Sequence, residues 1–99
     1  MAHMSPDMYR GVLEKAKRLI NKAKAYLNGQ TTDGLTIPII FKQDLEEMIL
    51  ECENTKANLS VAIKGLKQGS PKESGYQSAL KEIYSVQSEL QYYKDELFK

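Results

Sequence analysis

Apolar residues recur at steps of three and four positions in three stretches of the chain, and this pattern constrains the fold more than any other feature. It is typical of helices that bury one side, because residues three and four apart share a helix face. The stripes are Val12, Leu13, Ala16, Leu19, Ile20, Ala23, Tyr26 and Leu27; Leu45, Met48, Ile49, Cys52, Leu59, Ala62, Ile63 and Leu66; and Tyr76, Ala79, Ile83, Val86, Leu90, Tyr93 and Leu97. The sequence therefore predicts helices over about residues 6–28, 40–68 and 71–98.

Start and stop signals flank these stretches. Ser5-Pro6-Asp7 has the form of a helix start, with a hydroxyl cap followed by proline and an acid. Asn28-Gly29 predicts the end of the first helix, and Gly69 predicts the end of the second. Ser70-Pro71-Lys72-Glu73 matches a capping box at the start of the third helix. The second helix is expected to be weaker in its polar middle, around residues 54–58.

A helix with a single apolar stripe is unstable alone in water, so the three stripes are expected to share one core. The short link after the second helix makes the second and third helices antiparallel neighbours. The predicted fold is all-α, an antiparallel three-helix up-down-up bundle with long second and third helices. Residues 1–4 resemble an expression-tag remnant. Residues 5–99 are expected to form a single domain, excerpted from a larger protein.

Composition narrows the class of protein. Apolar residues make up 41% of the 99 positions and the formal net charge is +1, which is typical of a globular domain without a strong overall field. No apolar run approaches the length of a membrane span, and no signal peptide opens the chain. The lone Cys52 cannot form an internal disulfide. We therefore expect an intracellular location, in the cytoplasm or nucleus, and no membrane span.

Opposite charges are concentrated in the first helix and in the start of the second. Residues 7–28 hold six basic and two acidic side chains, whereas residues 42–54 hold one basic and five acidic. In an antiparallel hairpin these segments lie side by side, so their charges are expected to favour that pairing. Exposed ion pairs are individually weak, and burial is expected to hold the fold.

The sequence offers no catalytic constellation. The only histidine, His3, lies in the tag-like segment, so no nucleophile can be matched with a base. Cys52 shares a stripe with apolar residues and is expected to be a core residue. The acids of residues 44–53 lack the calcium-loop spacing around a glycine and are interpreted as a solvated face. We predict a non-enzyme with no cofactor and no metal site.

Residues 35–41 contain apolar side chains outside the helical rhythm. They either cover the open end of the bundle or form an exposed strip that receives another chain. Tyr84 and Tyr92 are expected at the border and on the outside of the third helix. The candidate partner-binding residues are Leu35, Ile37, Ile39, Ile40, Phe41, Tyr84 and Tyr92. The leading hypothesis is a non-catalytic protein–protein interaction or structural module that binds a partner peptide or helix, in an inter-helical groove or at this strip.

Two alternatives remain open. A nucleic-acid-binding domain would use the basic first helix to contact phosphates. The candidate residues are Arg10, Lys15, Lys17, Arg18, Lys22 and Lys24. Acids of the second helix are available to neutralise them, which makes this alternative the weaker one. The third helix carries apolar residues at heptad positions, so self-association through a coiled coil is the other possibility.

Overall fold

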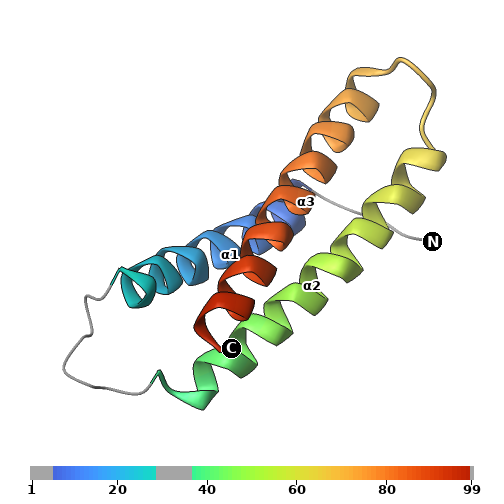
Figure 1. Ribbon diagram of the computed structural model, residues 1–99. Coiled ribbons are helices and arrows are strands. Elements are labelled where there is room, and N and C mark those ends of the chain that lie inside the picture. Colours follow the sequence, from blue (N-terminus) through green and yellow to red (C-terminus); the bar gives the residue numbers. More distant parts are fainter. Residues whose placement is uncertain (1–5, 29–36, 99) are drawn as a thin grey trace.

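Three helices pack against one another in an up-down-up arrangement (Figure 1). The structure is a computed structural model that describes the backbone of residues 6–28 and 37–98 and the side chains of residues 9–28 and 37–98. Helix α1 spans Pro6–Leu27, α2 spans Ile39–Lys64 and α3 spans Pro71–Leu97; the described residues contain no strand. The prediction of an all-α three-helix bundle is confirmed. The tag-like segment and residues 29–36 lie outside the described residues.

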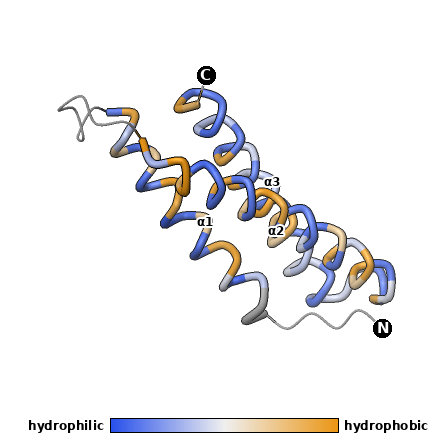
Figure 2. Tube along the Cα trace, turned by 90° about the horizontal axis from the view of Figure 1, so that it is seen from below, coloured by the Kyte–Doolittle hydropathy of each residue, from blue (hydrophilic) through white to orange (hydrophobic). Residues whose placement is uncertain are grey.

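The core is built from the predicted stripes, and Figure 2 shows the apolar and hydrophilic segments alternating along each helix. Each helix contributes residues at three- and four-residue steps, because those positions share a face. The buried apolar residues are Val12, Leu13, Ala16, Ile20, Ala23, Phe41, Leu45, Met48, Cys52, Leu59, Ala79, Ile83, Val86 and Leu90. The middle of the heptad seam of α3, from Ala79 to Leu90, is thus buried within the bundle, and self-association through it would require the bundle to open.

The middle of α2 is an uninterrupted helix in spite of its polar sequence. Thr55 lies in the core at 5% exposure, and its hydroxyl donates a hydrogen bond of 2.8 Å to the Glu51 carbonyl oxygen. This back-bond satisfies the hydroxyl without a partner from another helix. A position that sequence analysis assigned to a polar interruption is therefore part of the core.

The turn between α2 and α3 begins earlier than the sequence predicted. Helix α2 ends at Lys64 rather than near residue 68, because Gly65 has low helix propensity and its N–H bonds to the Ala62 carbonyl in a tighter turn. The left-handed conformation at Gly69, with φ of 84°, completes the turn. The predicted Ser70 cap is confirmed, since Ser70 Oγ accepts from the Glu73 N–H at 3.2 Å; Glu73 Oε1 reaches back one residue further than the capping box requires and accepts from the Gly69 N–H at 2.9 Å.

Helix α1 covers only part of the α2–α3 hairpin. It is inclined to the hairpin, and the turn that joins α2 to α3 lies beyond the start of α1 (Figure 1). Helix α3 packs against both other helices, whereas α1 and α2 contact each other least. The junction between α1 and α2 is therefore the most open of the three.

Candidate functional site

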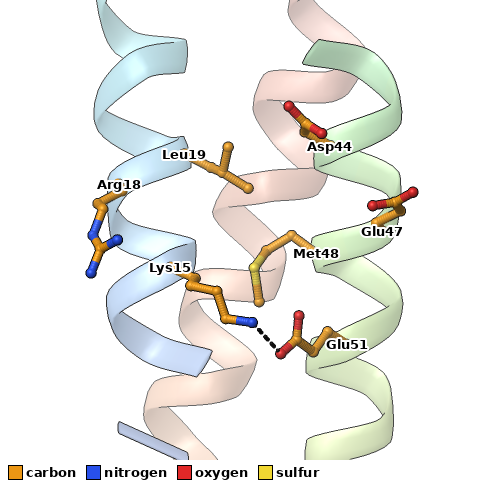
Figure 3. A pocket seen from close by; sticks show the side chains of 7 residues that line it. All are labelled: Lys15, Arg18, Leu19, Asp44, Glu47, Met48 and Glu51. Carbon is orange, nitrogen blue, oxygen red and sulfur yellow. Dashed lines mark hydrogen bonds and ion pairs between the residues drawn. The ribbon is translucent and has the colours of Figure 1, made fainter. Parts of the chain in front are cut away.

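An open groove runs between α1 and α2, with α3 behind it (Figure 3). Its volume is about 350 Å³, near the lower end of the range for ligand-binding pockets. This space accommodates a few side chains rather than a polypeptide backbone. The lining residues are Lys15, Arg18 and Leu19 from α1 and Asp44, Glu47, Met48 and Glu51 from α2. We refer to this feature as the α1–α2 groove.

The floor of the α1–α2 groove is apolar. Leu19 and Met48 point from opposite sides into the space between the two helices (Figure 3). Leu19 is half-buried against the core, and Met48 is 3% exposed. Methionine is flexible and adapts to different apolar neighbours, which makes it common on surfaces that bind other chains. An incoming apolar side chain would thus contact the core through these two residues.

The two walls of the groove carry opposite charges. The charged lining residues of α1 are basic, Lys15 and Arg18, and those of α2 are acidic, Asp44, Glu47 and Glu51. Among the described residues, an ion pair crosses the groove from Lys15 Nζ to Glu51 Oε1 at 2.9 Å. The predicted side-by-side placement of the basic and acidic segments is confirmed at this pair.

The other wall charges do not pair across the groove. Arg18 contacts Glu14 of its own helix, with 3.8 Å between Nη2 and Oε2, and both side chains are more than two-thirds exposed. Within the described part of the chain, neither Asp44 nor Glu47 has an ion pair. Exposed contacts of this kind are easily exchanged for others. Charges on both walls are therefore available to a bound molecule.

The predicted strip at residues 35–41 is divided by the structure. Leu35 lies outside the described residues, Ile37 is half-buried, and Ile39 and Ile40 are exposed. Phe41 is a core residue at 2% exposure, with its ring centroid 5.1 Å from that of Tyr26. It is thus unavailable for partner contact.

Helix α2 includes residue 41 in its first turn, which explains the burial of Phe41. A helix that starts at Ile39 places residue 41 on the same face as Leu45, Met48 and Cys52. The sequence predicted this helix from about residue 40, and the structure starts it at Ile39, directly after the extended Pro38.

Tyr84 and Tyr92 are both exposed, at 54% and 53%, as expected for the border and outer face of α3. The Tyr84 ring lies 4.1 Å from Lys56 Nζ, and Tyr92 packs edge-to-face on Tyr93. Lys56 is about 24 Å along α2 from Ile40, at about 1.5 Å per residue. Tyr84 and the exposed isoleucines therefore do not form one surface.

The six basic residues proposed for phosphate binding divide between two edges of α1. On the edge toward α2, Lys15 pairs with Glu51 and Lys22 Nζ lies 5.6 Å from the Phe41 ring centroid. The opposite edge carries Arg10, Lys17 and Lys24 at seven-residue intervals; since α1 packs against α2 on one side and α3 on the other, helical spacing puts this edge toward α3.

The edge of α3 that lies toward Arg10, Lys17 and Lys24 of α1 carries acidic residues. Helix α3 contacts α2 through Gln87 and Lys94, so its other edge lies toward α1. The acids on that edge, at the same seven-residue interval, are Glu82, Glu89 and Glu96. Sequence analysis missed this second complementary pair of charged rows, although the spacing of the acids was visible.

The thiol of Cys52 is unreactive in the folded state. Its side chain is fully buried, and burial raises the pKa of the thiol to about 11, with the nearby Glu51 carboxylate acting in the same direction. Among the described residues, no three His, Cys, Asp or Glu side chains gather in a way that would hold a metal ion. The described helices also include none with the length and apolar character needed to cross a membrane.

Comparison with known proteins finds no matching family model, no similar curated protein and no similar solved structure. The fold and the groove are therefore the basis for assigning a function.

Proposed function

We propose that this chain is a non-catalytic protein-interaction module of an intracellular protein, and that it binds a partner α-helix along the α1–α2 groove. The observation that carries the proposal is a groove between α1 and α2 whose apolar floor is formed by half-buried Leu19 and, beneath it, buried Met48. Binding of an amphipathic helix in an apolar groove is a recurrent mode of peptide recognition. The reduced, buried Cys52 is consistent with an intracellular location.

The geometry favours a helix as the ligand. The side-chain ridge of one helix packs into the groove between two others. A partner helix over α1 and α2 would therefore complete a four-helix bundle. The groove volume suits the side chains of such a ridge, which recur at three- and four-residue steps. The partner backbone would lie outside the groove and its apolar side chains inside.

A neutral amphipathic peptide tests the proposal. Its sequence would have leucines at the a and d positions of about three heptads and glutamine elsewhere. Methyl NMR is expected to show saturable shifts of the Met48 and Leu19 methyl groups, while the Ala79 methyl on α3 serves as an internal reference. Saturable binding that leaves Met48 and Leu19 unshifted would disprove the groove as the docking site, and so would a complete lack of binding.

Phosphate binding by α1 is the less supported function. The two basic edges face acidic residues of α2 and α3, and a nucleic acid would be repelled by those carboxylates. A generic DNA duplex at low salt is the appropriate probe. Salt-sensitive binding that is lost in an Arg10→Ala/Lys17→Ala/Lys24→Ala variant would establish this function instead.

A further inference from the structure

From the charges of the α1–α2 groove we infer the chemistry of its ligand: an amphipathic helix with acidic residues along one edge and basic residues along the other. The acidic edge lies against α1 and the basic edge against α2. This inference rests on the proposed function, since it specifies which helix the groove selects. It makes no use of the exposed isoleucines at the start of α2.

Each wall of the groove presents a single sign of charge. Arg18 and Lys22 remain on the α1 side once Lys15 is paired with Glu51, and Lys22 faces α2 through the Phe41 ring. Asp44 and Glu47 remain on the α2 side. The apolar floor between the walls fixes which face of a bound helix points inward, so its two edges necessarily meet walls of opposite charge.

A ligand of uniform charge gains nothing from this arrangement. A wholly acidic helix is attracted by the α1 wall and repelled by the α2 wall, and a wholly basic helix experiences the reverse. A helix with separated charges is attracted by both walls. Like-charge contacts cost several-fold in affinity, so the groove discriminates by repulsion as well as by attraction. The carboxylates of the α2 wall disfavour phosphate polymers for the same reason.

The separated charges also fix the direction of binding. Turning a helix end to end while its apolar face stays on the floor exchanges its two edges. A peptide with glutamates on one edge and lysines on the other is therefore expected to bind in one direction. A peptide with the two edges exchanged is expected to bind in the opposite direction with equal affinity.

The test compares stapled peptides of identical composition and the same leucine face. In the segregated peptide, glutamates occupy one edge and lysines the other; in the mixed peptide, both residues alternate along each edge. We expect the segregated peptide to bind about tenfold more tightly, from several weak ion pairs acting together, and the difference to vanish at high salt. The neutral glutamine peptide measures docking itself.

Variants of the acidic wall provide the second arm. Asp44→Lys/Glu47→Lys makes both walls basic, and it is expected to abolish the preference for the segregated peptide and to create one for a uniformly acidic peptide. The matched control, Ser85→Lys/Ser88→Lys/Asp95→Lys, changes the net charge by the same amount at exposed positions on the outer side of α3, away from the acids that lie toward α1, and it is expected to keep the original preference. A nitroxide on the peptide N-terminus should broaden the amide of Ala25 with one edge arrangement and that of Gly11 with the other.

The outcomes separate this inference from the proposed function. Equal affinity of segregated and mixed peptides, with Met48 shifted by both, overturns the inference and leaves the groove as a docking site. A uniformly basic or acidic peptide that binds the wild-type chain as tightly as the segregated one also overturns it. Failure of all peptides, including the neutral one, disproves the proposed function. A dimer in sedimentation that is lost in Asp44→Lys/Glu47→Lys would replace the partner helix with a second copy of the chain.

Discussion

Charged and polar side chains border both the α2–α3 junction and the α1–α2 junction, but they close the first and leave a groove at the second. Between α2 and α3, Gln87 donates hydrogen bonds to the Ile49 carbonyl and to Glu53, and Lys94 pairs with Glu46. Between α1 and α2, Lys15 pairs with Glu51 and Phe41 packs on Tyr26, and the groove beside these contacts stays open. Side chains that already bond to each other within the molecule are less available to a partner. The α1–α2 groove is therefore the junction available for binding.

Replacement of Phe41 is expected to have the largest effect, because it closes one end of the open junction from within the core. Phe41→Asp removes a buried ring and buries a charge, and it should lower the free energy of unfolding by at least about 4 kcal/mol. The matched control Ile40→Asp, at an exposed first-turn position, should change it by less than about 0.5 kcal/mol. Urea unfolding followed by circular dichroism measures both. Equal effects of the two variants would contradict the placement of Phe41.

Truncation of leucines compares the shared core with the groove floor. Leu90 is fully buried on α3, and Leu90→Ala should cost about 3 kcal/mol of unfolding free energy. Leu19 is half-buried, so Leu19→Ala should cost about 1 kcal/mol, because part of its surface is already in water. The same urea titration measures the difference. A Leu19 effect as large as that of Leu90 would show that the α1–α2 junction is closed in solution.

The buried thiol of Cys52 predicts a pH dependence of stability. Its pKa rises from 9.0 to about 11 on folding, so the folded state holds the proton more tightly than the unfolded state. The contribution is constant below about pH 9, and stability falls by about 2 kcal/mol as the pH rises from about 9 to about 11. Unfolding of the wild type and of Cys52→Ala across this range isolates the effect. Parallel profiles for the two proteins would refute it.

Ion-pair coupling is expected to be the smallest effect and to differ little between the junctions. The Lys15–Glu51 pair spans the open junction with side chains 55% and 40% exposed, so its coupling energy should be about 0.5 kcal/mol or less. Lys94 is less exposed than Lys15, but its distance to Glu46 is longer, 3.4 Å, so a similar value is expected. Double-mutant cycles with alanine measure both. A coupling above about 1 kcal/mol for Lys15–Glu51 would mean that this pair, and not α3, sets the distance between α1 and α2.

The periodic stripes determine the fold and only part of the site. Residues such as Leu45, Ile83 and Leu90 fall at the expected steps, and burial of their common face leaves few arrangements for three helices. The groove was less accessible to sequence analysis, because it depends on how α1 is inclined to the hairpin. Thr55 was missed because a threonine that bonds its own helix is indistinguishable in sequence from an exposed one. Phe41 was assigned to the strip because Pro38 obscured where the helix starts.

The hairpin beyond the start of α1 rests on two helices alone, and no residue between Leu59 and Ala79 is buried. Segments with few buried contacts open without global unfolding. In hydrogen–deuterium exchange, the amides near the turn should therefore lose protection first, and those around Leu45 and Leu90 last. Local unfolding would then begin at the α2–α3 turn while the walls of the α1–α2 groove stay folded. The groove would thus remain preorganised for an incoming helix.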